Sequence, residues 1–282
     1  MKIAISCETA ADFNSELIEK LNVHVVPFQI LLGDENKFDG EITTDQIIEF
    51  VNRTGILPKT GAVNIAQFNE YFENLKKSYD AIIHVSLSSE LSSTFSNAQR
   101  SAEQMKNVYV VDSRSLSTGI ALLVLYARSL VEKGLHADKI YNLLLKRVKS
   151  VQASFALKRL DYLYKGGRCN SLTYFGANLL KIRPQIIVKD GKMISGKKYR
   201  GSFDHVVKSY CKDTLEQFDN PDLENAFVTY TTAEPEVVDV AVGFLKDRGF
   251  KNVYVTRAGG TITSHCGENC LGILYLNDGG VE

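Results

Sequence analysis

The sequence has no net charge, no long hydrophobic run and no leader pattern at its start. Its 33 Lys and Arg residues balance 33 Asp and Glu residues, so nothing indicates a surface for nucleic acid or for an anionic membrane. No apolar stretch approaches the roughly 20 residues of a membrane span. Residues 1–6 enter a strand pattern directly, without the apolar region of a signal peptide. We therefore expect a cytoplasmic protein that neither binds nucleic acid nor inserts stably into membranes.

Cysteine is scarce, and its five residues are an odd number. Without a secretory context, reduced thiols are the default. His265, Cys266 and Cys270 are close in sequence, but a closed zinc site needs four ligands and no second pair has a supporting spacing. We expect neither a metal nor another cofactor.

Motifs for nucleotide binding and for serine hydrolysis are also missing. There is no G-x-G-x-x-G fingerprint and no G-x-S-x-G elbow. Residues 191–198 come close to a phosphate-binding P-loop, but Lys198 stands where Ser or Thr should reach magnesium. Ser209 and Lys212 fit S-x-x-K only within a helical pattern. The sequence therefore predicts no catalytic residues and a protein that is not itself an enzyme.

The chain length of 282 residues favours two domains. In the first half, strands alternate with helices, which indicates βαβ units and a parallel sheet. The second half adds a hairpin turned at Asp190-Gly191 to further βαβ pieces, which indicates a mixed sheet. We expect an α/β fold with an N-terminal parallel-sheet α/β/α domain over residues 1–150 and a C-terminal mixed-sheet α/β domain over residues 151–282.

Local patterns predict individual elements as well. Thr44 is placed to cap a helix over residues 45–52. Hydrophobic period and turn residues predict the following further elements: a helix over 11–21, one strand over 24–32, a loop over 59–64 and a helix over 171–180.

A serine-rich stretch, residues 86–94, lies between a predicted buried strand at 81–85 and a predicted helix at 95–105. The first N–H groups of a helix lack partners and carry partial positive charge, so such a junction can bind a phosphate or a carboxylate. Alternatively, one or two of the hydroxyls serve only as helix caps. The residues alone leave both interpretations open.

Other polar residues are predicted to lie in loops at the ends of elements, namely Thr60, Arg168 and His265. A catalytic triad would need a carboxylate to orient the histidine, and Glu268 is the only local acid. Hydroxyls with one Arg and one His suit a carboxylate-binding site better than a catalytic one. Each residue also has a purely structural alternative, as a loop cap, a helix cap or a turn residue.

Taken in order, these segments resemble the DegV family of bacterial lipid-binding proteins along nearly the whole chain. The resemblance rests on blocks in the family's order and spacing: Lys2 to Asp12, Val25-Val26-Pro27, Phe38-Asp39-Gly40, Lys59-Thr60-Gly61, Ser88 to Phe95, Val111-Asp112-Ser113, Tyr162 to Arg168, and His265-Cys266-Gly267.

The resemblance implies a two-domain α/β protein that holds one long-chain fatty acid between its domains. It implies that Thr60 and Ser92 hydrogen-bond the carboxylate, with Arg168 and His265 near the head group. The neighbours Ser93 and Thr94 belong to the same expected site. Some members of the family are the fatty-acid-binding subunit of a fatty acid kinase, whose separate catalytic subunit phosphorylates the carboxylate. The resemblance places Lys197, Lys198 and Arg200 where such a partner binds.

The chain departs from the family pattern at several positions near this expected site. Glu8-Thr9 replaces Asp-Ser, Gly61 replaces Ser, Ser93 replaces Gly, and Glu268-Asn269 replaces Pro-Gly. Two alternatives therefore stay open. One is a serine-dependent acyl hydrolase or transferase that uses Ser92 with His265, and the other is a protein that binds a small molecule other than a lipid.

Overall fold

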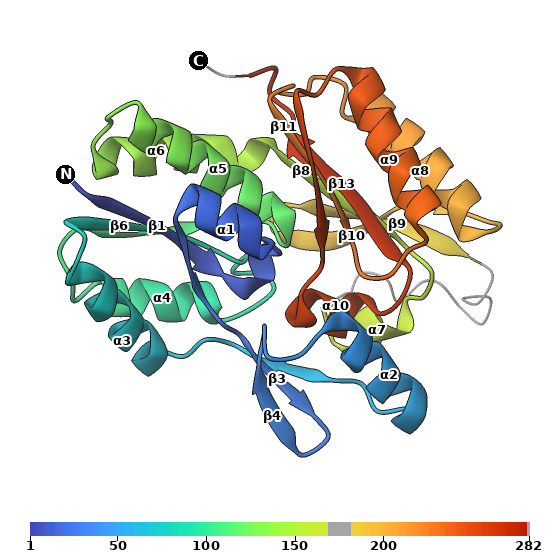
Figure 1. Cartoon of the computed structure of the whole chain (residues 1–282), viewed down its shortest axis with the longest axis horizontal. Helices are drawn as coiled ribbons and strands as arrows, with labels where there is room; N and C mark the ends of the chain where they lie inside the picture. The colour runs from blue at the N-terminus through green and yellow to red at the C-terminus, as the bar shows by residue number, and fades with distance from the viewer. Residues whose placement is uncertain (169–181, 281–282) are drawn as a thin grey trace.

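The computed structural model describes residues 1–168 and 182–280 (Figure 1). The helix predicted over residues 171–180 lies outside this part of the chain. The strands of the described part form three sheets, with strand orders β2-β1-β6-β7, β10-β9-β8-β13-β11-β12 and β4-β3-β5.

The four-stranded sheet of the N-terminal domain is parallel throughout. Its strands are β1 (Ile3–Glu8), β2 (Val23–Val26), β6 (Ala81–Ser86) and β7 (Val108–Asp112). Helices α3 (Ile65–Lys76) and α4 (Thr94–Ala102) cover one face, and α5 (Thr118–Glu132) and α6 (Ala137–Arg147) cover the other, with α1 (Ser15–Leu21) beside β2 (Figure 1). Because both faces are covered, every residue of β1 and β6 is buried.

The six-stranded sheet of the C-terminal domain is mixed, since only β11 and β12 pair in parallel. Its strands are β8 (Val151–Leu157), β9 (Arg183–Lys189), β10 (Lys192–Tyr199), β11 (Asn225–Tyr230), β12 (Asn252–Arg257) and β13 (Cys270–Leu276). Helices α8 (Phe203–Gln217) and α9 (Pro235–Arg248) pack on one face. The hairpin β9–β10 turns at Asp190 and Gly191, whose φ angles of 50° and 81° suit a type I′ turn, as predicted.

The third sheet is small and lies beside the junction of the domains (Figure 1). It consists of β3 (Gln29–Leu32), β4 (Glu35–Phe38) and β5 (Lys59–Gly61), and helix α2 (Thr44–Thr54) connects β4 to β5. The remaining elements are short: η1 (Thr9–Ala11), η2 (Val148–Ser150), α7 (Asp161–Lys165) and α10 (Gly260–Cys266).

Four local predictions were wrong. The strand over 24–32 is broken after Val26, because Pro27 has no N–H for a sheet ladder, and its halves join different sheets. The predicted loop contains β5, which pairs with β3. Helix α1 begins at Ser15, capped by Asn14, rather than at residue 11. Helix α2 is capped by Thr43, which forms a capping box with Gln46, so Thr44 is already helical.

Helix α5 joins the two domains. It packs on β1 and β6 and also on β8, β11 and β13 of the mixed sheet, and ten of its fifteen residues are buried. One hydrophobic core therefore extends from Ile5 of the first sheet to Leu274 of the second. The parallel sheet is complete before residue 150 and the mixed sheet starts at Val151, so we propose the domain boundary there.

No helix within residues 1–168 or 182–280 is long and apolar enough to cross a membrane. Across the same residues, no group of three or more His, Cys, Asp or Glu side chains is placed to hold a metal ion.

Candidate functional site

A cavity lies between the two domains and contains about 530 Å³ of atom-free space, counting its open mouth. Both halves of the chain contribute to its wall. The lining residues are Phe28, Thr60, Ala62, Leu87, Leu91, Ser92, Leu116, Leu163, Arg168, Met193, Thr261, Ile262, His265 and Cys266. Of the six residues predicted for the site, Thr60, Ser92, Arg168 and His265 therefore line one cavity, although they are far apart in sequence.

A second cavity, with about 320 Å³ of atom-free space counting its open side, adjoins the first and shares Leu116, Ile262 and Cys266 with it. Strands β8, β11 and β13 form most of its remaining wall. Three hydroxyl groups of that wall are engaged within the protein: Thr229 with Thr118 and Thr256, Ser117 with Asp12, and Thr231 with the Cys270 N–H. The wall also includes Tyr230. The two cavities therefore form one elongated, mainly apolar space, with Thr60, Ser92, Arg168 and His265 in the wall of the first cavity.

Thr60 and His265 meet in the wall of the first cavity. Both were predicted in loops, but Thr60 lies on β5 and His265 on α10. Thr60 is paired with the buried Ile30, so it is on the inner face of the small sheet. Its Oγ1 lies 2.9 Å from His265 Nε2.

The protonation state of His265 determines whether the Thr60 hydroxyl hydrogen is available to a ligand in the cavity. Burial, with the nearby Arg168 charge, lowers the pKa of His265 to about 4, so the ring is neutral at physiological pH. Nδ1 is buried and has no hydrogen-bond partner in the described structure. An unpaired acceptor is less costly there than an unpaired N–H, so we assign the proton to Nε2, which donates to Thr60. The Thr60 hydroxyl hydrogen is then free to point into the cavity.

Ser92 lines the cavity just before α4, whereas Ser93 and Thr94 do not. Ser92 Oγ accepts from the Thr94 N–H at 3.2 Å and lies 2.9 Å from Thr94 Oγ1. Thr94 is fully buried behind it, and Ser93 is exposed at the N-cap position without a side-chain cap. Thr94 thus orients Ser92, and Ser93 faces solvent.

The other hydroxyls of the serine-rich stretch hold the fold together. Ser86 donates to Glu8 at 2.6 Å, Ser88 donates to the Gly191 carbonyl at 2.8 Å, and Ser89 donates to Asp112 at 2.6 Å. These partners lie in distant segments of the chain. Ser86, Ser88 and Ser89 therefore have structural roles other than helix capping.

Arg168 lies at the rim of the first cavity and is exposed. Its guanidinium donates to the Gly166 carbonyl at 2.7 Å and to the Leu91 carbonyl at 3.4 Å. The Leu91 contact joins the end of α7 to the serine-rich stretch, so Arg168 connects the two domains at the cavity mouth.

Two buried aspartates of the N-terminal domain hold the start of α10. Asp39 accepts from the Gly260 and Thr261 N–H groups at 2.7 and 2.9 Å, and Asp12 accepts from the Gly259 N–H at 2.8 Å. A Cβ on Gly260 would lie 2.3 Å from Cδ1 of the buried Ile30, so a larger residue there would force this side chain to move. Sequence reasoning did not assign either aspartate to the site, although both lie in blocks that resemble the family pattern.

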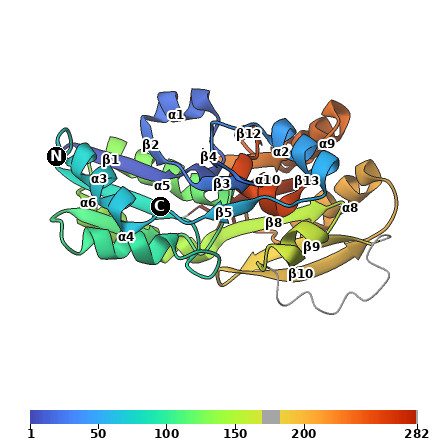
Figure 2. The ribbon, with the colours of Figure 1, turned by 90° about the horizontal axis from the view of Figure 1, so that it is seen from below.

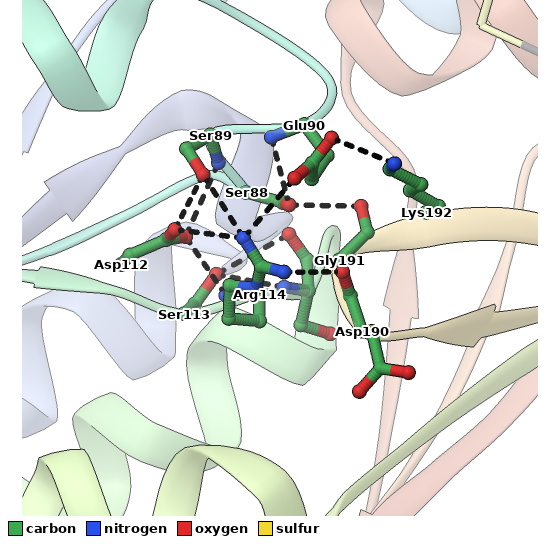
Figure 3. A network of polar contacts seen from close by, with 10 residues as sticks. Ser88, Ser89, Glu90, Asp112, Ser113, Arg114, Asp190, Gly191 and Lys192 are labelled. Atoms are coloured by element: carbon green, nitrogen blue, oxygen red, sulfur yellow. Dashed lines mark hydrogen bonds and ion pairs between the residues drawn. The ribbon is translucent and has the colours of Figure 1, made fainter.

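The turn of hairpin β9–β10 docks onto the serine-rich stretch (Figure 3). Arg114 donates to the Asp190 carbonyl at 2.6 Å, and Lys192 pairs with Glu90 at 3.4 Å. A Cβ on Gly191 would lie 2.5 Å from Ser88 Oγ, so only glycine permits this close approach. Met193 follows directly and lines the first cavity, so this contact fixes one part of its wall.

A Ser–His–Glu chain of hydrogen bonds lies inside the parallel sheet. Ser6 Oγ is 2.8 Å from His84 Nδ1, and His84 Nε2 is 3.1 Å from Glu8. All three side chains are fully buried, and none lines either cavity. Glu8 also accepts from the Leu87 N–H at 3.0 Å, so this network anchors the serine-rich stretch instead of meeting a substrate.

The geometry does not favour Ser92 and His265 as a nucleophile and base. His265 Nε2 bonds to Thr60, and Ser92 bonds to Thr94. Glu268 pairs with Lys158 at 3.2 Å, and within the described residues no carboxylate orients the His265 ring. The arrangement suits hydrogen bonding to a ligand.

The predicted partner-binding residues lie elsewhere. Lys197 and Lys198 are on the edge strand β10 rather than on a loop, and Arg200 follows it. All three are exposed, and Lys197 pairs with Asp213 at 2.8 Å. None of them lines either cavity.

Comparisons with known proteins agree over almost the entire chain. The family model described as "Uncharacterised protein, DegV family" matches residues 2–278. A fatty acid-binding protein of Thermotoga maritima is 28% identical over 283 residues and covers 96% of each chain. The crystal structure of DegV, a fatty acid binding protein from Bacillus subtilis, has a TM-score of 0.85 at 26% identity and covers 99% of this chain and 100% of that chain.

A fatty acid binding DegV family protein from Thermus thermophilus has the same fold, with a TM-score of 0.90 at 23% identity and coverage of 99% of this chain and 100% of that chain. The two domains and the order of their elements are thus those of solved DegV structures. With the family match over residues 2–278, this chain belongs to the DegV family.

Proposed function

We propose that this protein is a non-enzymatic carrier that binds one long-chain fatty acid across the two joined cavities. The observation that carries the proposal is the elongated, mainly apolar space with Thr60, Ser92, Arg168 and His265 grouped in its first part. Relatives from Thermotoga maritima and Bacillus subtilis that are described as fatty acid-binding proteins support the same ligand class.

The acyl chain supplies most of the binding free energy in this proposal. A palmitate-sized tail has about 14 methylenes, each worth about 0.8 kcal/mol on burial, or roughly 11 kcal/mol in total. Ordering the tail and losing free motion costs several kcal/mol. The remaining apolar gain, with the hydrogen bonds to the carboxylate, should keep the acid bound through purification.

The carboxylate needs donors, because an unpaired buried charge is costly. Thr60 is suited to donate because His265 already occupies its oxygen. Ser92 lies on the same wall, with its orientation set by Thr94 and the exposed Ser93 beside it. Arg168 at the rim supplies a positive charge. We assign Thr60, Ser92, Arg168 and His265 to the head-group site, with Thr94 as the residue that orients Ser92, whereas Ser93 faces solvent.

The experiment that tests this function is the analysis of protein purified gently from a bacterial host. Solvent extraction and mass spectrometry should recover about one long-chain fatty acid per protein molecule, with none added. Protein that is consistently empty, or that carries an unrelated small molecule, would contradict the proposal.

Substitution of Thr60 or Ser92 by alanine should weaken fatty-acid retention. Each change removes a hydrogen bond to a charged group, worth about 1.5–3 kcal/mol, while the fold should persist because both residues line a cavity. Competitive exchange with a labelled fatty acid measures the loss. The matched control is Ser96→Ala, since Ser96 bonds only to the Ser93 carbonyl. Unchanged retention in the double variant would place the carboxylate elsewhere.

We further propose that this carrier acts in the cytoplasm and presents the carboxylate to the catalytic subunit of a fatty acid kinase. The chain has no recognisable motif for ATP of its own, so phosphorylation would require a partner. A basic edge formed by Lys197, Lys198 and Arg200 is suited to steer such a partner.

Arg200→Ala should leave the lipid content intact and lower the rate of acyl phosphate formation with a cognate kinase subunit. The reason is that Arg200 is exposed and lines neither cavity. Lys246→Ala, which removes an exposed charge from α9, is the control. Loss of lipid in the Arg200 variant, or full activity with the kinase, would refute the assignment.

A further inference from the structure

One hydroxyl group in the first cavity has no partner among the described residues. Helix α10 carries three hydroxyl side chains, and two of them are engaged: Thr263 Oγ1 lies 3.1 Å from Thr44 Oγ1, and Ser264 donates to the Gly260 carbonyl at 2.7 Å. Thr261 Oγ1 is buried, and no hydrogen bond to it is formed by the described residues. Thr261 is 4% exposed and lines the first cavity.

The position of Thr261 is fixed relative to the proposed head-group site. Thr261 and His265 are four residues apart on α10, so they lie on the same face, about one helical turn of 5.4 Å apart along the axis. Both line the first cavity. Asp39 accepts from the Thr261 N–H at 2.9 Å, which holds this residue in place at the start of the helix.

A buried hydroxyl that meets only apolar atoms destabilises a protein relative to valine, which has the same shape. The wall of the first cavity is largely apolar, and no described residue bonds the Thr261 hydroxyl. The space in front of the hydroxyl is the cavity itself. A hydrogen-bonding partner for Thr261 should therefore belong to the ligand.

We propose that Thr261 is a further ligand-binding residue whose hydroxyl bonds an oxygen atom of the bound acid. This inference rests on the proposed function. The oxygen has two possible sources, because the carboxylate and a hydroxyl or oxo group on the first few carbons of the chain both lie within reach of a residue one turn from His265. In the second case, the carrier selects fatty acids oxygenated near the head group.

The test compares the affinities of palmitic acid and its 2-, 3- and 4-hydroxy derivatives for full-length, delipidated protein. Thr261→Val removes the hydroxyl and keeps the shape, and Thr261→Ser keeps the hydroxyl. Thr261→Ala also removes the hydroxyl but has no branched side chain. It replaces Thr261→Val in the test if valine disturbs α10. Thr263→Val is the matched control, because that hydroxyl is bonded within the protein.

If the carboxylate is the partner, Thr261→Val should weaken the binding of every acid by about tenfold or more, as for a hydrogen bond to a charged group. If a chain oxygen is the partner, the same change should weaken at least one hydroxy acid by about three- to tenfold and leave palmitic acid unchanged or tighter. In both cases Thr261→Ser and Thr263→Val should bind like the unmodified protein.

Two other outcomes are distinguishable. Affinities that all stay within about twofold in Thr261→Val and Thr261→Ala would mean that the hydroxyl meets only water, and the inference would be overturned. Failure of the unmodified protein to bind any of the acids would instead overturn the proposed function on which the inference rests.

Discussion

Asp39→Ala should lower the free energy of unfolding by about 3–5 kcal/mol and release the bound fatty acid. The buried Asp39 carboxylate accepts from two backbone N–H groups at the start of α10, and each such charged hydrogen bond contributes about 1.5–3 kcal/mol. The substitution leaves both N–H groups without a partner. Because α10 carries Thr261 and His265, its displacement should also disrupt the head-group site.

Denaturant unfolding and fatty-acid exchange measure the two effects of Asp39→Ala. Asp12→Asn is the control: Asp12 accepts from the N–H of Gly259, the N-cap residue just before α10, and burial raises its pKa to about 8. Asn has the shape of the neutral acid that this pKa favours at pH 7, so the loss should be about 1 kcal/mol or less. Equal effects of the two changes, or lipid retention in Asp39→Ala, would show that Asp39 does not hold the site.

Glu8→Ala should lower the free energy of unfolding by a similar amount, about 3–5 kcal/mol. The carboxylate of Glu8 is fully buried and meets Ser86 Oγ at 2.6 Å, the Leu87 N–H at 3.0 Å and His84 Nε2 at 3.1 Å. Removing it leaves these groups buried without their acceptor. Leu87 lines the first cavity, so fatty-acid retention should fall as well.

Thermal or denaturant unfolding of three variants tests the role of Glu8. Glu8→Asp introduces the residue of the family pattern at this position. Because it keeps a carboxylate, this variant should lose less stability than Glu8→Ala. Ser6→Ala removes only the Ser6–His84 bond at the outer end of the network and should lose about 1 kcal/mol. A Glu8→Ala protein as stable as Ser6→Ala would contradict the assignment of Glu8 as the anchor of residues 86–94.

The sequence pattern predicted the alternation of strands and helices well, because the regularly spaced apolar residues of long elements form their buried faces. The β9–β10 turn was predicted correctly. The errors concern segments whose structure depends on distant partners. Three residues, Lys59–Gly61, are too few to show a period, and they become a strand only because β3 lies beside them. Helix α10 starts with glycines, which favour loops, and Asp12 and Asp39 hold it in place.

Four candidate residues of the site could be named from the sequence and share one cavity, Thr60, Ser92, Arg168 and His265. The pattern could not separate Ser92 from its neighbours, since the burial of Thr94 and the exposure of Ser93 arise from the packing of α4. Thr261 was missed because its lack of a partner is visible only once every neighbouring hydroxyl has been placed.

A crystal structure of the protein as purified from a bacterial host tests the proposed carrier function most directly. Continuous acyl-chain density is expected, starting with a carboxylate at Thr60 and Ser92 and passing Leu116, Ile262 and Cys266 into the second cavity. Density for a compact ligand confined to the first cavity, or for a chain whose carboxylate lies away from Thr60 and Ser92, would contradict it.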